Sequence, residues 1–374
     1  ERGIRILLDG VFNHTGSQSV YFNADGFYPS LGAAQSKDSP YYDWFQFSRW
    51  PDSYDAWWGI DTLPNVREDC PDYVDYIIQG ENSVVKRWLR AGASGWRLDV
   101  ADELPGEFIE KLRAAVEETD PDALVLGEVW EDASNKISYS RRRRYFLGRE
   151  LHGVMNYPFR TALLHYLLDG PAEDFQAAME TLRENYPPAA FYSAMNFLGT
   201  HDTPRVLTLL GGVPLPEGRE AQSVFSLTQL QREAALERLH VAAAILFTFP
   251  GSPMIYYGDE AGMEGAADPF NRQTYPWGQE NQTLLEWFRW LGQLRKGRAS
   301  LRRGTLSWLA AQGPLLAYLR EVPGEATATL VNAGPEEQTV TLPGGGFQDL
   351  RTGESIPGEV ASVLPYSVRL LGQG

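Results

Sequence analysis

Short apolar segments alternate with helical patterns through most of the chain, and this alternation constrains the fold more than any other feature. The strand-like segments are 4–11, 94–100, 124–130, 152–156, 194–199 and 253–257. The helical patterns, in which apolar residues recur at three- and four-residue spacing, cover 105–119, 159–168 and 236–249. Strands separated by helices form right-handed βαβ units around a parallel sheet. The sequence therefore predicts an α/β fold.

Three stretches depart from this rhythm. Residues 15–75 are rich in Gly, Pro, Asp, Ser and aromatic residues and lack periodicity, which predicts an inserted, loop-rich subdomain. A second irregular insertion covers 211–230. From 299 onward the segments are short, β-rich and punctuated by Gly and Pro. We therefore expect a main α/β domain over 1–298 and an antiparallel β-sandwich domain over 299–374.

Composition limits the classes of partner. The net charge of −16 argues against nucleic acid and against an anionic membrane surface, because both require a cationic footprint. No apolar run approaches the roughly 20 residues that a membrane helix needs. The single cysteine, Cys70, rules out an intrachain disulfide and is compatible with a reducing compartment. We expect a cytoplasmic protein, although a targeting segment could precede the unusual start Glu1-Arg2-Gly3.

Polar side chains stand at or just past the C-terminal end of four of the six expected strands. They are Asp9, Asn13 and His14; Arg97 and Asp99; Glu128; and His201 and Asp202. In a parallel α/β barrel the strands end at a shared pocket. Burying charge is costly unless it is paired, so Arg97 is expected to hold Asp99 ionised while Asp99 faces that pocket. Three carboxylates from three strands suit glycoside chemistry, which needs one nucleophile and one proton donor.

Four segments in this order resemble the signature segments of the α-amylase family of glycoside hydrolases. They are DGVFNH (9–14), GWRLDVADE (95–103), GEVW (127–130) and GTHD (199–202). GVMNYPF (153–159) and SPMIYYGDEAGM (252–263) are similar to the cyclomaltodextrinase, neopullulanase and maltogenic amylase branch. The resemblance implies a (β/α)8 TIM barrel as the catalytic domain, followed in the sequence by the C-terminal β-sandwich.

The same resemblance implies a role for each candidate residue. Asp99 would be the nucleophile, Glu128 the acid/base and Asp202 the stabiliser of the transition state. The substrate-binding residues would be His14, Arg97, His201, Trp130 and Glu103, with Trp130 and Glu103 on the leaving-group side. Asp9 and Asn13 would give structural support. In many relatives the asparagine matching Asn13 binds calcium, but the other ligands cannot be identified, so we expect no required cofactor and leave calcium at Asn13 open.

Two departures from the branch leave the preferred glucan open. Leu63-Pro64-Asn65-Val66 stands where the branch commonly has Met-Pro-Lys-Leu, and Asp102-Glu103 where it tends to have Asn-Glu. Segment 4–11 matches the family's third barrel strand, so the first two strands are expected to be missing from this chain. We hypothesise that the chain is one piece of a longer protein, and that a companion N-terminal segment or a partner in a homodimer completes the barrel.

Three functions stay open. The first is retaining hydrolysis of α-1,4-glucosidic bonds in maltooligosaccharides, cyclodextrins, pullulan or starch, with some transglycosylation. The second is an α-glucan transferase on the same scaffold. The third is a catalytically silent carbohydrate-binding homologue.

Several other residues suit either a structural or a functional role. Core packing is favoured over sugar stacking for four tryptophans in loop-like surroundings, which are Trp44, Trp50, Trp57 and Trp58. The run Arg141–Arg144 is expected to be a solvated face. His152, His165 and His240 are interpreted as structural histidines.

Overall fold

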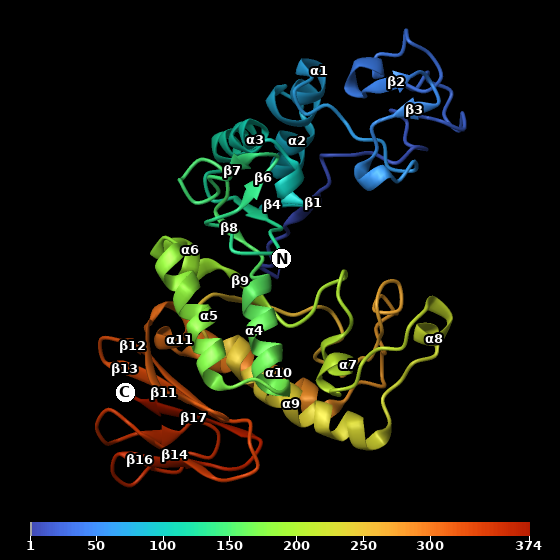
Figure 1. Cartoon of the computed structure of the whole chain (residues 1–374). Coiled ribbons are helices and arrows are strands. Elements are labelled where there is room, and N and C mark those ends of the chain that lie inside the picture. Colours follow the sequence, from blue (N-terminus) through green and yellow to red (C-terminus); the bar gives the residue numbers. More distant parts are fainter. Residues whose placement is uncertain (1) are drawn as a thin grey trace. The chain divides into compact units, whose positions relative to one another are not determined.

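The computed structural model describes residues 2–374 and divides into two compact units, Glu1–Met155 and Asn156–Gly374 (Figure 1). The division falls inside the range 1–298, so neither unit coincides with the expected main domain. That domain range stays a prediction.

The first unit is built on a four-stranded parallel sheet in the order β1-β4-β5-β8. The strands are β1 (Leu8–Gly10), β4 (Gly95–Leu98), β5 (Leu124–Gly127) and β8 (Gly153–Val154). Each lies within its expected segment but is shorter. The shortening of β4 has a local cause: the chain turns at Val100, whose φ of 38° is left-handed and incompatible with an extended strand.

Helices α2 (Val84–Arg90) and α3 (Gly106–Thr119) connect these strands. Helix α3 matches the expected helix 105–119 to within one residue. It buries Phe108, Ile109, Leu112, Ala115 and Val116, the apolar residues at helical spacing. The three- and four-residue spacing therefore identified the buried face of this helix correctly.

The insertion 15–75 contains only short elements. They are η1 (Tyr42–Trp44), β2 (Phe47–Arg49), β3 (Ser53–Tyr54), η2 (Trp57–Gly59) and α1 (Pro71–Val74), which leads into the π-helix η3 (Asp75–Gln79). Aromatic rings form its core: Phe22 contacts the rings of Phe45, Phe47 and Tyr54. Trp44 is buried. The aromatic residues replace the periodic apolar pattern that a helix or strand would supply, so the insertion is held by ring packing rather than by regular ladders.

Beyond β5 the first unit carries a small hairpin of β6 (Ile137–Ser138) and β7 (Arg141–Arg142). In the second unit, β9 (Met195–Phe197) and β10 (Ser252–Met254) form a two-stranded parallel sheet. The helices of the second unit are α4 (Tyr157–Leu168), α5 (Ala172–Asn185), α6 (Pro188–Ser193), α7 (Val206–Leu210), α8 (Arg219–Ser223), α9 (Gln229–Thr248), α10 (Gln282–Gly297) and α11 (Ala299–Arg303). The expected parallel α/β fold is thus observed as two separate parallel sheets.

The end of the chain is antiparallel. The strands are β11 (Thr305–Gln312), β12 (Leu315–Val322), β13 (Glu325–Asn332), β14 (Gln338–Thr341), β15 (Gln348–Asp349), β16 (Val360–Val363) and β17 (Ser367–Gln373). They form a five-stranded sheet, β11-β12-β13-β17-β15, and a two-stranded sheet, β14-β16. Leu319, Leu330, Val340 and Phe347 belong to one buried cluster that both sheets contribute to.

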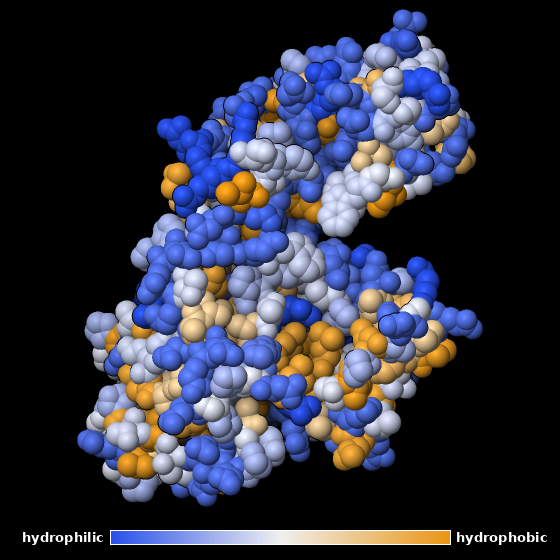
Figure 2. Space-filling view, in the orientation of Figure 1, coloured by the Kyte–Doolittle hydropathy of each residue, from blue (hydrophilic) through white to orange (hydrophobic). Residues whose placement is uncertain are grey.

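Figure 2 shows how residue types are distributed on one face of each unit. The first unit is largely hydrophilic there, with isolated apolar residues, whereas the second also carries gathered apolar residues. Among residues 2–374, no helix combines the length and the apolar character that crossing a bilayer requires.

Candidate active site

The parallel register of the first unit aligns the ends of three strands. Asp9 pairs with Arg97 in the ladder of β1 and β4, and Leu98 pairs with Gly127 in the ladder of β4 and β5. The backbone of Asp99 donates to Gly10 O (3.1 Å) and that of Glu128 to Leu98 O (3.0 Å). The sheet hydrogen bonds therefore continue one residue past the strands and bring Asp99 and Glu128 to the same edge.

Arg97 is the centre of this edge. Its Nη1 lies 2.6 Å from Asp9 Oδ1 and 2.6 Å from Asp99 Oδ1, and its Nη2 lies 2.8 Å from Glu128 Oε2 outside hydrogen-bond geometry. The side chain of Arg97 is only 11% exposed. Burial opposes its charge, but the carboxylates of Glu128, Asp9 and Asp99 outweigh this and hold the pKa of Arg97 above its usual value. The sequence pointed to the contact with Asp99, but not to those with Asp9 and Glu128.

Glu128 is 4% exposed and both of its carboxylate oxygens accept hydrogen bonds. Val100 N donates to Oε2 (2.8 Å) and Trp130 Nε1 donates to Oε1 (3.0 Å). Val100 is β-branched, and its φ of 38° is a strained conformation for such a residue. Strain of this kind persists where the surroundings over-determine it, commonly at functional sites. No sequence signal marks the backbone of Val100 as a donor, so this contact was missed.

His14 and Asn13 follow β1. Asn13 is 3% exposed, and its Oδ1 lies 2.9 Å from Nδ1 of His14. Burial lowers the pKa of His14, although the Asp99 carboxylate opposes the shift. The imidazole also stacks on Trp57, with ring centroids 5.1 Å apart. His14 is thus held between an amide and an indole.

Calcium at Asn13 would need further ligands from its surroundings. Within residues 2–374, no group of three or more His, Cys, Asp or Glu side chains is placed to hold a metal ion. Oδ1 of Asn13, the oxygen that a calcium ion would use, already contacts His14. Calcium at Asn13 stays a prediction.

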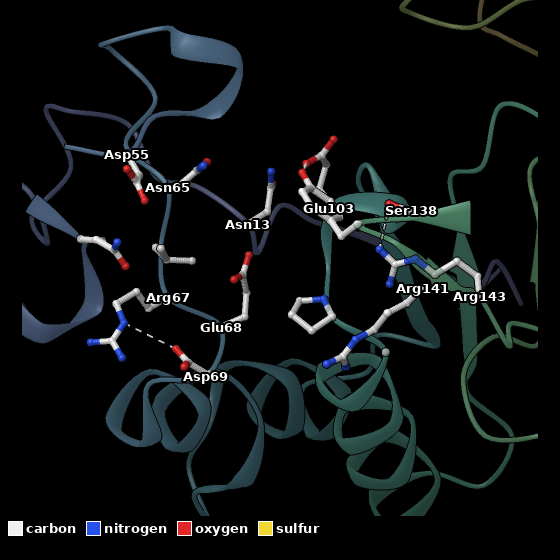
Figure 3. A pocket seen from close by; sticks show the side chains of 15 residues that line it. Asn13, Asp55, Asn65, Arg67, Glu68, Asp69, Glu103, Ser138, Arg141 and Arg143 are labelled. Carbon is white, nitrogen blue, oxygen red and sulfur yellow. Dashed lines mark hydrogen bonds and ion pairs between the residues drawn. The ribbon is translucent and has the colours of Figure 1, made fainter. Parts of the chain in front are cut away.

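A cavity of about 580 Å³ opens beside this edge within the first unit. Its lining includes Asn13, Glu68, Glu103 and Arg143, but neither Asp99 nor Glu128. Figure 3 shows Glu68 directed toward the middle of the cavity, between Asn13 and Asp69. Glu103, a candidate substrate-binding residue, and Asn13, a candidate supporting residue, therefore both line an open polar space.

Glu68 was not singled out from the sequence. Burial raises its pKa to about 7, and the charges of Asp69 and Glu103 add to this, against one opposing backbone hydrogen bond. Its neighbours in sequence, Arg67 and Asp69, pair with each other at 3.5 Å. Glu68 is a single carboxylate in a segment that lacks periodicity, so no sequence pattern indicates its environment.

The expectation of a solvated arginine run at 141–144 is wrong for Arg143. This side chain is buried, and its guanidinium donates to the carbonyl oxygens of Leu104 (2.6 Å) and Asp102 and to Ser138 Oγ (3.1 Å). Buried carbonyl groups need donors, and Arg143 supplies them to the turn that carries Glu103. Glu103 itself accepts a hydrogen bond from the Tyr139 hydroxyl.

Asp202 and His201 lie in the second unit, just after β9. Nε2 of His201 lies 3.1 Å from Asp202 Oδ2, and Nη2 of Arg272 lies 3.5 Å from Asp202 Oδ1. Both Asp202 and His201 are partly exposed, at 31% and 40%. Asn271 Nδ2 fixes the backbone by donating to the carbonyl oxygens of His201 (2.7 Å) and Thr203 (2.8 Å). The place of Asp202 in a shared site with Asp99 and Glu128 stays a prediction.

The fold and the residues around Arg97 define a class of protein, which is an α/β protein with paired carboxylates at the ends of parallel strands. Residues 1–287 match the family model described as the catalytic domain of alpha amylase. The chain therefore belongs to the alpha-amylase family of glycoside hydrolases, as its four signature segments had indicated.

Named relatives agree with this assignment. The chain is 35% identical to an amylopullulanase of Thermoanaerobacter thermohydrosulfuricus over 90% of its length, and 33% identical to neopullulanase 2 of Thermoactinomyces vulgaris over 100%. A solved cyclomaltodextrinase structure covers all of the chain with a TM-score of 0.82 and 27% identity. Proteins named cyclomaltodextrinase and maltogenic alpha-amylase are also relatives, which confirms the branch that the sequence resembled.

The chain spans only part of these proteins. It covers 25% of that amylopullulanase, 60% of neopullulanase 2 and 60% of the cyclomaltodextrinase structure. The family's (β/α)8 barrel with a C-terminal β-sheet domain is represented here by its parallel strands and its antiparallel end, and no barrel closure is seen among residues 2–374.

Proposed function

We propose that the protein cleaves α-1,4-glucosidic bonds in maltooligosaccharides, cyclodextrins, pullulan or starch with retention of configuration. The observation that carries this proposal is the set of ion pairs between Arg97 and the carboxylates of Asp9, Asp99 and Glu128 at the ends of parallel strands. The names of the relatives, neopullulanase, amylopullulanase and cyclomaltodextrinase, support the substrate class.

In the first step, Asp99 attacks the anomeric carbon and forms a glycosyl ester, while Glu128 gives its proton to the departing glycosidic oxygen. Arg97 keeps Asp99 ionised and fixes its direction, because it holds Oδ1 at 2.6 Å. In the second step, water attacks the anomeric carbon, Glu128 takes the proton of the water, and the bond to Asp99 breaks, which releases its carboxylate. Glu128 already accepts from Val100 N and Trp130 Nε1, so its orientation is fixed for both steps.

The remaining roles are assigned by the family resemblance and by local geometry. Asp202, with His201, would bind ring hydroxyls and favour the oxocarbenium-like transition state. His14 would hydrogen-bond the sugar at the cleaved bond through Nε2, because Nδ1 is directed to Asn13. Trp130 and Glu103 would line the leaving-group side, and the lining of the cavity by Glu103 supports this.

Completion of the barrel is part of the proposal. β1 pairs with β4 on one side only among the described strands, and apolar Ile4 and Ile6, which precede it, are 78% and 58% exposed. An unpaired apolar edge favours association. We infer that a companion segment, or else a second copy of the chain, covers this edge.

A reducing, cytoplasmic setting is also part of the proposal, and it is supported by the buried and single Cys70.

Transfer to an acceptor sugar is the second candidate, since hydrolysis and transfer share the glycosyl ester and differ in what attacks it. The polar lining of the cavity, which includes Asn13 and Glu103, supports some transfer, because an acceptor sugar needs polar partners. Product analysis with and without added maltose separates the two outcomes. A silent homologue is disfavoured because Asp99, Glu128 and Asp202 are all present.

The test is to incubate the full-length protein with β-cyclodextrin, pullulan and starch and to compare it with Glu128→Gln. We expect turnover to fall by several orders of magnitude, since the amide cannot donate the proton. Glu107→Gln, an exposed carboxylate on α3, is the matched control and should keep full turnover. Comparable rates for wild type and Glu128→Gln would place the acid elsewhere.

A further inference from the structure

Three aromatic rings form a stack that runs from the candidate site to the surface of the first unit. His14 stacks on Trp57 with ring centroids 5.1 Å apart and an interplanar angle of 18°. Trp57 stacks in turn on Trp58 at 5.4 Å and 29°. Trp58 is 80% exposed, so one face of its indole meets Trp57 and most of the ring faces solvent. The expectation of core packing is therefore wrong for Trp58, and its exposure is unusual for tryptophan, which is highly buried on average.

The backbone holds Trp58 in a conformation that costs energy. Its φ is 51°, in the left-handed region that few residues other than glycine adopt, and Gly59 follows with a φ of 73°. Nothing lies within 4 Å of the position where a Cβ on Gly59 would stand. The turn therefore presents a large apolar ring to solvent beside open space, although neither its backbone strain nor its exposure favours folding. Strain of this kind commonly marks a binding function.

The loop that carries Trp58 is closed by backbone hydrogen bonds. Trp57 N donates to Leu63 O (2.9 Å), Leu63 N to Ile60 O (2.8 Å) and Ile60 N to Trp57 O (3.0 Å). These bonds close the turn on itself. The closed turn, and the stacking of one indole face on Trp57, restrict the orientation of Trp58, which reduces the ordering cost of a ligand that stacks on it.

The same loop is anchored on the segment of His14. Thr15 N donates to Pro64 O (3.0 Å), Ser17 N donates to Thr62 O (2.8 Å), and His14 forms a β-bridge with Asn65. Three polar atoms near this junction, Thr15 Oγ1, Trp57 Nε1 and Asn65 Oδ1, are buried and have no hydrogen-bond partner among the described residues. Because these three atoms are buried, they are not open to a ligand; the backbone hydrogen bonds and the bridge instead fix the distance between His14 and Trp58.

We propose that Trp58 is a stacking platform for a glucosyl residue of an α-glucan chain, beyond the residue that His14 contacts. The inference rests on the proposed function and adds a specificity-determining residue to it. The C–H face of a glucopyranose is apolar and flat enough to cover an indole, while its hydroxyl groups remain directed to water and to polar neighbours. Asp55 and Asp61 are exposed on the same loop and can accept from such hydroxyls.

The platform predicts a dependence on chain length. A glucan long enough to reach Trp58 gains the stacking contact, whereas a short substrate that occupies only the positions around His14 does not. Trp58→Ala should therefore weaken the binding of maltoheptaose about tenfold, and leave maltotriose within about twofold. Because the contact is remote from the cleaved bond, KM should rise while kcat stays within about twofold.

The experiment uses the full-length protein in two backgrounds. In active protein, KM and kcat are measured for maltotriose and maltoheptaose with wild type, Trp58→Ala and Trp58→Tyr, which restores a flat ring and should recover binding to within about threefold. In Glu128→Gln protein, calorimetric titration with maltoheptaose measures the same affinities without turnover. Trp88→Ala removes another exposed tryptophan of this unit, 51% exposed on α2, and should change nothing.

Equal affinity of wild type and Trp58→Ala for maltoheptaose would overturn the platform. So would a loss that is equal for both chain lengths, because that result indicates a general structural effect. If wild type lacks glucan cleavage, or Glu128→Gln retains it, the proposed function itself has failed. An active, Glu128-dependent enzyme with an unaffected Trp58→Ala variant rejects the platform alone.

Discussion

The two units carry candidate catalytic residues in different settings. In the first, Arg97 is 11% exposed and lies within 2.8 Å of three carboxylates. In the second, Asp202 and His201 are 31% and 40% exposed, and Arg272 lies 3.5 Å from Asp202. Buried charges are costly to separate, whereas exposed ones are screened and easily rearranged. The first group is therefore suited to holding a nucleophile in place, and the second to adjusting to a sugar hydroxyl.

The largest effect on stability is expected from Arg97→Met. Removal of one partner leaves the carboxylates of Asp99 and Glu128 without their cation, so the free energy of unfolding should fall by about 3–5 kcal/mol. Urea denaturation measures this change. Arg90→Met, which breaks an exposed pair with Glu81 in the same unit, is the control and should cost less than about 1 kcal/mol. Similar losses for both variants would remove the contrast between buried and exposed charge.

The second prediction concerns the stability of the fold at low pH, which we expect to depend on His240 in the second unit. Burial, and then Arg351, lower its pKa to about 4, and its ring stacks on Trp287 at 3.9 Å. Its neutral form stabilises the fold above the unfolded pKa of about 6.5, and this contribution is lost as the pH falls through 4. His240→Phe keeps a stacking ring that does not titrate. The Tm of His240→Phe minus that of wild type should therefore rise by about 4 °C when the pH is lowered from 8 to 5. Calorimetry measures both values.

Glu68 in the first unit should respond in the opposite direction. Its folded pKa of about 7 exceeds the unfolded value, so its contribution is present below the unfolded pKa and lost as the pH rises through 7. The Tm of Glu68→Gln minus that of wild type should therefore rise by roughly 3 °C when the pH is raised from 5 to 8. A constant difference across that range would show that Glu68 titrates normally.

The smallest effect is expected for Arg272→Met in the second unit. Arg272 lies 3.5 Å from Asp202 and 2.8 Å from Asp268, and all three side chains are partly exposed, so loss of both contacts should lower the free energy of unfolding by less than about 1 kcal/mol. The same urea measurements apply. A loss near that of Arg97→Met would mean that the second group is as tightly held as the first.

The sequence predicted elements better than contacts between them. The periodicity of 105–119 located α3, and the apolar runs located all six parallel strands, because both patterns are local. The ends of the strands were less accurate, since Val100 leaves the ladder through a left-handed conformation that no pattern encodes.

The candidate residues followed from their positions at strand ends and from the family resemblance. Three features could not be found in this way: the hydrogen bond from Val100 to Glu128, the burial of Arg143 and the environment of Glu68. Each depends on which loop packs against which. Spacing along the sequence gives no indication of such contacts, least of all in the irregular insertion 15–75 that carries Glu68, so only coordinates reveal them.

The most direct test of the central claim is to identify the residue that becomes covalently bound to sugar. The full-length protein is treated with a slow-reacting fluorinated glucosyl fluoride, digested, and its peptides are measured by mass spectrometry. If Asp99, held by Arg97, is the nucleophile, the sugar will be found on the peptide that contains Asp99 and will be absent from Asp99→Asn protein. Sugar on a different carboxylate, or a label that survives in Asp99→Asn, would contradict it.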